Sequence, residues 1–278
     1  MWDIYDSPAW ESLRGFLLSP YHLVFGMYVD WLNPFTNKIA GKVISCGAIV
    51  LYCLSLPLAV RFLPENTFII GMMPGPGMPN VQTISHILIS VQKAIGEFDL
   101  PGKLLPTFRF PNHTTVAARI IPLIADLQAI RKVAGYASHA ANLFCSFCKC
   151  VKDDVEDLAH HTWHLRTGAE VHHQAEEWHN AVTVAKKEEI VKKTGVRWTP
   201  LHNLPYWNPV SHVMLGYMHN FLEGVLQYQL RSLWGIGRSK SATTQATLHD
   251  TEDTVSEAEI SESQDELDGL SQEAEEVG

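Results

Sequence analysis

The chain has 278 residues, of which 46% are hydrophobic and 10% aromatic, and its formal net charge is −9. This length holds one large domain or two small ones with a real hydrophobic core. Five cysteines, an odd number, and an acidic, aromatic start (MWDIYDSPAW) exclude the usual pattern of a secreted disulfide scaffold. We therefore expect reduced thiols in a nuclear or cytoplasmic protein.

The negative charge is concentrated at the end of the chain. Twelve acids and a single base, Lys240, lie from Ser239 onward, which leaves 20 bases and 18 acids in residues 1–238. The net charge therefore neither indicates nor excludes nucleic-acid binding. Because 239–278 consists mainly of polar and acidic residues, we expect a disordered acidic tail.

The first half of the chain predicts an irregular segment followed by strands. Residues 1–20 are the irregular N-terminal segment. Apolar runs predict strands at 22–30, at 42–56 (one long strand or two short ones) and at 66–73. The Gly- and Pro-rich stretch 74–79 lacks the GK[ST] ending of a phosphate-binding loop, which favours a plain turn.

The apolar run from Val43 to Val60 has a second interpretation. It contains no charged residue and is just long enough to cross a membrane. However, it contains Gly47, Ser55 and Pro57 and is rich in β-branched residues, which favours a strand buried on both faces. We therefore predict no membrane partner.

The second half predicts helices around one further strand. Apolar spacing predicts a helix over 81–98, a strand over 115–125 and a helix over 127–135. Residues 139–205 are polar and His-rich, and we expect a mostly helical insertion rather than core. The apolar residues of 211–234 again follow a helical spacing, which predicts a helix over this range. The order of these elements predicts an α/β fold, a ribonuclease H-like mixed sheet with helices, spanning 21–238.

Three isolated acids in apolar surroundings are candidates for a metal site. Asp30 ends the first strand, Asp126 ends the fourth, and Glu223 lies in an apolar helix. Carboxylates that converge from separate elements can hold the Mg²⁺ or Mn²⁺ ions used in phosphodiester chemistry. The alternative is that each acid caps a helix or pairs with a base, and Asp126 before LQAIRK is well placed as an N-cap.

Cys145 and Cys148 have the CxxC spacing of half a tetrahedral zinc site. Histidines would have to complete this Zn²⁺ site. His219 is a candidate, because it lies seven residues after His212 and four before Glu223, so that all three could share one helix face. A pair of structural free thiols explains the same spacing.

A basic cluster follows the CxxC motif. It comprises Lys186, Lys187, Lys192, Lys193 and Arg197. It could contact a DNA backbone, although a solvated helix face paired with Glu188 and Glu189 is the simpler interpretation.

Several long, ordered blocks carry a family resemblance. They are VDWLNPFTNKIAGK (29–42), GMMPGPGMPN (71–80), IADLQAIRKVAGYASHAANLFCSFCKC (124–150) and GVRWTPLHNLPYWNPVSHVMLGYMHNFLEGVLQ (195–227). They resemble the CACTA (En/Spm-like) transposase family of fungal transposase-derived proteins, kin to the Kyakuja-Dileera-Zisupton group.

The resemblance implies a DDE-type transposase core with an insertion before the last acid. It implies cleavage and joining of DNA at transposon ends with Mg²⁺, carried by Asp30, Asp126 and Glu223, and it allows a homo-oligomer. The matched CxxC is Cys145 and Cys148, and the matched histidine is His219. Because this chain starts close to the first strand, we expect a truncated copy, either active or a catalytically inactive relic or domesticated interaction module.

Overall fold

The computed structural model describes residues 3–32, 46–73, 81–157 and 163–236. The predicted turn at 74–79 and the predicted disordered tail at 239–278 lie outside these residues. One mixed sheet organises the fold, with strand order β3-β2-β1-β5-β4 and with β6 also paired to β5. The strands are β1 (His22–Leu32), β2 (Cys46–Cys53), β3 (Thr67–Met73), β4 (Lys103–Leu105), β5 (Thr114–Ala125) and β6 (Val213–Leu215).

The directions of the strands divide the sheet into two parts. β1, β2 and β3 form an antiparallel meander. By contrast, β5 runs parallel to β1, and β6 runs parallel to β5. The carboxyl ends of β1, β5 and β6 therefore meet at one edge of the sheet. The predicted strands at 22–30, 66–73 and 115–125 are confirmed.

The apolar run at 43–60 contributes a central strand. Its part 46–53 forms β2 between β1 and β3, and the chain then enters the short helix α2 (Leu58–Arg61). The strand prediction is confirmed for 46–53, whereas 42–45 lies outside the described residues. In the part of the chain that the structure describes, no helix is long and apolar enough to span a bilayer.

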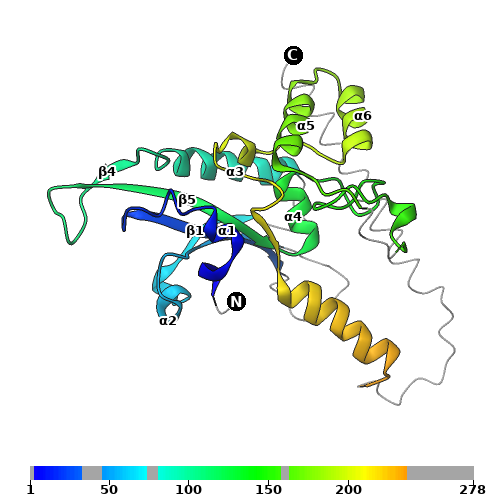
Figure 1. Cartoon of the computed structure of the whole chain (residues 1–278), viewed down its shortest axis with the longest axis horizontal. Helices are drawn as coiled ribbons and strands as arrows, with labels where there is room; N and C mark the ends of the chain where they lie inside the picture. The colour runs from blue at the N-terminus through cyan, green and yellow to red at the C-terminus, as the bar shows by residue number, and fades with distance from the viewer. Residues whose placement is uncertain (1–2, 33–45, 74–80, 158–162, 237–278) are drawn as a thin grey trace.

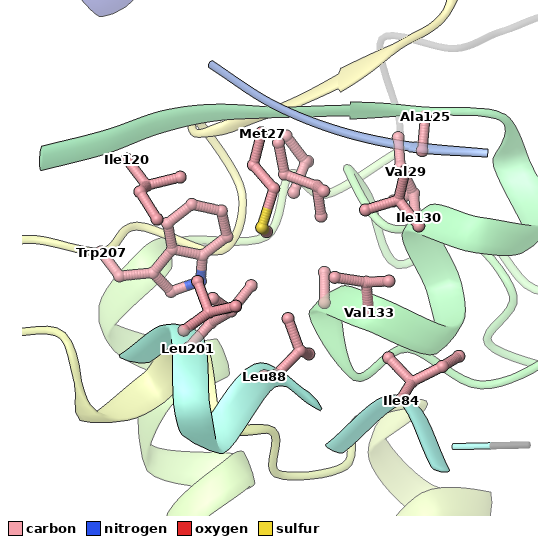
Figure 2. Close-up of a cluster of buried hydrophobic side chains, with 14 of the residues drawn as sticks. Met27, Val29, Ile84, Leu88, Ile120, Ala125, Ile130, Val133, Leu201 and Trp207 are labelled. Carbon is pink, nitrogen blue, oxygen red and sulfur yellow. The ribbon is translucent and has the colours of Figure 1, made fainter. Parts of the chain in front are cut away.

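Two helices cover one face of the sheet and enclose the main core. They are α3 (Val81–Gly96) and α4 (Leu127–Ala134), which confirms both helices predicted here. α3 buries Ile84, Leu88, Val91 and Ile95, which recur at the spacing of one helix face. In Figure 2 the side chains of α3 and α4 meet those of β1 and β5, such as Met27 and Ile120.

The N-terminal segment packs on the opposite face of the sheet (Figure 1). It contains the helical turns η1 (Ile4–Asp6) and α1 (Pro8–Glu11). After them, Leu13 and Phe16 pack in a second cluster with strand residues such as Val24 and Ile121. Asp3 joins the segment to α2, because both of its carboxylate oxygens accept hydrogen bonds from Arg61, at 2.8 and 3.2 Å.

The segment 139–205 contributes to the main core. Its helices are α5 (Gly168–Asn180) and α6 (Val184–Thr194), so the prediction of helices is confirmed. The expectation that the whole segment lies outside the core is wrong in its second half, where Val171, Ala175, Val196 and Leu201 join the main cluster. Val171 and Ala175 are four residues apart and form a narrow apolar stripe on one face of α5. This stripe is hard to recognise in the sequence, because most other residues of α5 are polar.

The helix predicted over 211–234 is confirmed only from Met218. The chain first forms β6, and then the π-helical turns η7 (Met218–Leu226) and η8 (Gln229–Leu233), which we call the C-terminal helix. In Figure 1 this helix projects away from the sheet. Its exposed apolar side chains include Phe221, Val225 and Tyr228.

Candidate functional site

Asp30 and Asp126 lie beside each other at the edge where the parallel strands end. Val29 of β1 is the register partner of Ala125 of β5, and each acid directly follows one of these residues. Because β1 and β5 are parallel, both chains run in the same direction at this point, where β5 ends and β1 continues to Leu32 in its pairing with β2. The sequence prediction that these two acids come together is supported by this register.

The Asp30 carboxyl is half-buried, and its neighbours act on its charge. Burial is the main cause that raises its pKa above the usual value, and the charges of Asp126 and Glu223 raise it further. His219 and the Trp31 backbone N–H, which donates to Oδ1 at 2.8 Å, oppose this shift. Asp30 therefore interacts with three titratable groups from two other elements.

Asp126 lies at this edge and also caps the first turn of α4. It is the N-cap of α4, and its Oδ1 accepts a hydrogen bond from the Ala129 backbone N–H at 2.6 Å. The N-cap interpretation from the sequence is thus confirmed. The Asp126 carboxylate therefore caps α4 through one oxygen, and it also contributes to the raised pKa of Asp30.

β6 brings His219 to the same edge. Leu215 is the register partner of Ala125, and the Gly216 N–H continues the ladder by donating to the Ala125 carbonyl at 2.7 Å. The C-terminal helix begins directly after this point. The His219 Nδ1 atom is buried and has no hydrogen-bond partner among the described residues.

Glu223 is the most distant member of the predicted set. It lies on the C-terminal helix one turn beyond His219, and its side chain is exposed. Its charge still raises the pKa of Asp30, so it belongs to the same electrostatic environment. Within the described residues, however, no group of three or more Asp, Glu, His or Cys side chains is arranged to hold a metal ion. The acids share an edge without converging on one point.

Tyr28 is a member of this edge that the sequence analysis missed. Burial raises the pKa of its phenol first, and the nearby charges of Asp30 and Asp126 raise it further. The signal was present in the sequence, because residues two apart in a strand point to the same face. Tyr28 and Asp30 are such a pair on β1.

The CxxC motif forms a tight turn around one sulfur atom. The backbone N–H groups of Phe147 and Cys148 both donate to the Cys145 Sγ at 3.4 Å. Burial raises the pKa of the Cys148 thiol, and a side-chain hydrogen bond with Cys145 raises it further. Cys150 is also buried, and its pKa is raised by burial and then by Cys145 and two acids, Asp154 and Asp157. All five cysteines of the chain are free thiols.

His219 interacts with Asp30, whereas none of the groups that shift the pKa of Cys148 or Cys150 is a histidine. A buried arginine holds the CxxC turn instead. The Arg166 Nε donates to the Cys145 and Cys148 carbonyls at 2.9 and 3.1 Å, and a second nitrogen donates to the Thr194 carbonyl at 2.8 Å. The sequence analysis did not single out Arg166, because a lone arginine in a polar segment gives no periodic signal.

Comparison with known proteins adds no assignment to this geometry. No protein-family model matches the chain, and no curated protein matches it at a significant level. The function is therefore argued from the site itself.

Proposed function

We propose that this chain carries the core of a DDE-type DNA transposase, whose ancestral reaction cuts and joins DNA phosphodiester bonds with Mg²⁺ or Mn²⁺. The observation that carries the proposal is the position of Asp30 beside Asp126 at one sheet edge, where the charges of Asp126 and of Glu223 on the C-terminal helix both raise the pKa of Asp30. A partly buried acid whose pKa is raised by neighbouring carboxylates is a frequent mark of a functional site.

The strand arrangement supports a ribonuclease H-like fold for this core. Three consecutive antiparallel strands are followed by a helix and then by two strands parallel to the first. The first three strands, α3 and β5 match the order expected from the sequence, whereas the short strands β4 and β6 were not predicted. The parallel pairing also places Asp30, near the end of β1, beside Asp126, which directly follows β5.

The donor types at this edge suit a hard divalent cation, which prefers carboxylate oxygen. Asp30 and Asp126 are the residues that would hold it, and the bound ion would activate a water or hydroxyl nucleophile and stabilise charge on the phosphate. Glu223 would complete the set only after the C-terminal helix brings its carboxylate nearer to the other two. The buried Nδ1 of His219 could exchange a proton with an attacking or leaving oxygen at this edge.

Metal titration of the full chain tests this proposal. Calorimetry with Mg²⁺ or Mn²⁺ should detect binding that Asp30→Asn and Asp126→Asn each abolish. Asparagine is chosen because it removes the charge and still caps α4. The matched control is Asp153→Asn, an exposed acid of the short helix η4 (Lys152–Asp154), which should bind as the wild type does. Metal binding with the same affinity in Asp30→Asn, Asp126→Asn and wild type would refute the proposal.

A second candidate function has a specific observation in its favour. No three donors among the described residues form a metal group, and Glu223 is exposed on a projecting helix. These facts favour a catalytically inactive relic or a domesticated interaction module that keeps the fold. The test that separates the two is cleavage of labelled DNA carrying candidate terminal repeats, with Asp30→Asn as the negative control.

A structural zinc ion is part of the proposal for the CxxC turn. The two backbone N–H groups directed at the Cys145 sulfur fix the CxxC turn in the compact form that a tetrahedral zinc site uses. Cys145 and Cys148 would supply two ligands, and buried Cys150 is the nearest further thiol that the pKa interactions identify.

A further inference from the structure

The C-terminal helix is an apolar surface that no other described part of the chain covers. None of its residues is buried, and Figure 1 shows it projecting from the body of the protein. Together with the residues that directly flank it, the helix carries nine large apolar side chains that are each 41–66% exposed. They are Tyr217, Met218, Phe221, Leu222, Val225, Tyr228, Leu233, Trp234 and Ile236.

The amount of apolar surface on this helix is too large for a protein that works alone in water. If a full side chain of this kind has on the order of 200 Å² of surface, nine half-exposed ones present roughly 900 Å². The largest apolar patch of a typical monomer is only about 300–600 Å². A helix that is apolar on most of its sides is normally buried. We therefore expect another surface to cover this one.

The helix cannot fold back onto its own sheet without losing the contacts that fix its first turn. The Gly216 N–H donates to the Ala125 carbonyl at 2.7 Å, and the Asn220 side-chain amide donates to the Gly216 carbonyl at 2.8 Å. The rings of Tyr217 and Phe221 also stack, with their centroids 5.0 Å apart. The covering surface must therefore come from outside the described body of the chain.

The residues that follow the helix are poorly suited to cover it. Residues 237–278 contain twelve acids and no Phe, Tyr or Trp. A segment of this composition has too little apolar surface to offset the entropy lost when it becomes ordered. A second copy of the helix, by contrast, offers the same apolar side chains.

We propose that two copies of this chain form a two-fold dimer in which their C-terminal helices pack against each other. Residues 217–236 contain one acid, Glu223, and one base, Arg231, so two helices can approach without net repulsion. One helix face is about half of the exposed surface, so the pair would bury roughly 900 Å² in total, near the lower limit for a specific interface. We therefore expect a reversible dimer. This inference does not rest on the proposed catalytic function.

Analytical ultracentrifugation of the full chain tests this dimer with two matched valine substitutions. In the wild type, the measured mass should rise with concentration toward twice the 31.2 kDa of one chain. Val225→Glu should raise the dimer Kd by about tenfold or more, because a charge would lose its water in the apolar interface. Val182→Glu should dimerise as the wild type does, since Val182 is 97% exposed and lies between α5 and α6.

The folding of the Val225→Glu variant is checked by circular dichroism. Val225 is 59% exposed in the single chain, so the substitution removes no internal contact that folding needs. Glutamate also has a higher helix propensity than valine. A loss of the dimer with an unchanged spectrum therefore reports on the surface and not on the helix.

Three results would overturn the dimer. The first is a wild type that stays monomeric up to about 100 µM, and hydrogen exchange would then show whether residues 237–278 protect the helix amides instead. The second is equal dimerisation of Val225→Glu and wild type, which would place the interface elsewhere. The third is growth in mass beyond the dimer, which would indicate unspecific aggregation. Both substitutions leave Asp30, Asp126 and Glu223 in place, so none of these results decides the metal-binding test.

Discussion

Asp30 and Asp126 are neighbours across a parallel pair of strands, because the residues before them, Val29 and Ala125, are register partners. The sheet itself therefore brings two negative charges together, and neither acid depends on a flexible loop for its position. Charges at such a site reduce stability when no cation is present, because burial and mutual repulsion both disfavour them. This relationship gives the first prediction.

Replacing Asp30 with Asn should stabilise the metal-free protein at neutral pH. The folded-state pKa of Asp30 is raised, mainly by burial, so the folded protein holds this proton more tightly than the unfolded chain does. Its contribution is fully present below the unfolded pKa and is lost as the pH rises through the folded pKa. Thermal unfolding should show a Tm increase of about 1–3 °C for Asp30→Asn at pH 7, allowing for solvent screening.

The same comparison at low pH provides the control. Below the ordinary carboxyl range, Asp30 is protonated in both states, so the difference between wild type and Asp30→Asn should vanish. A stability difference that is constant across this pH range would show that the charge of Asp30 is not its cause.

Purified protein should carry about one equivalent of zinc, and Cys145→Ser should release it, since Cys145 and Cys148 would supply two of the four ligands of a tetrahedral site. Metal content is measured by atomic emission after gel filtration. His219→Asn should retain the zinc, because His219 interacts with Asp30 and not with the buried cysteines. Cys46→Ser is the matched thiol control. A fully folded, metal-free protein would remove the zinc proposal.

Arg166→Met should be strongly destabilising. The Arg166 side chain is 4% exposed and donates to three backbone carbonyls that join the CxxC turn to the end of α6. Leaving those buried carbonyls without donors should lower the free energy of unfolding by about 3 kcal/mol or more. Chemical denaturation measures the loss. Arg14→Met, at an exposed arginine, should stay within about 0.5 kcal/mol of the wild type.

Gly135→Ala should destabilise the protein. Gly135 has a positive φ of 82°, and an added β carbon would lie 2.4 Å from the Arg197 carbonyl oxygen. We expect a loss of more than about 1 kcal/mol in denaturant titrations. Gly96→Ala is the matched control, because its β carbon would meet only the Gln92 side chain, at 3.8 Å. If both substitutions were neutral, the backbone at Gly135 would not be as constrained as its positive φ indicates.

The long apolar runs could be predicted from the sequence, whereas the short elements could not. Residues 115–125 form a mainly apolar run, interrupted by Thr115 and Arg119, whose length favours a buried strand, and 81–98 shows a clear helical period. β4 and β6 have three residues each, too few for any period to be visible, and β6 became part of a predicted helix.

The candidate site could be predicted in part for a similar physical reason. Asp30 and Asp126 are recognisable because an acid at the end of an apolar run is conspicuous. The relation of His219 to Asp30 depends on the pairing of β6 with β5, which is a long-range contact.

The parallel pairing of β1 with β5 also governs the order in which the chain can fold. His22 pairs with Ala117, so the sheet closes only after a very long intervening segment has been ordered. Contacts this distant along the chain slow folding, because the loop entropy is lost before the pairing is gained. During synthesis the β1–β3 meander would emerge first with one edge of β1 unpaired. We therefore expect a slow final folding phase in which β5 enters the sheet and the two acids first meet.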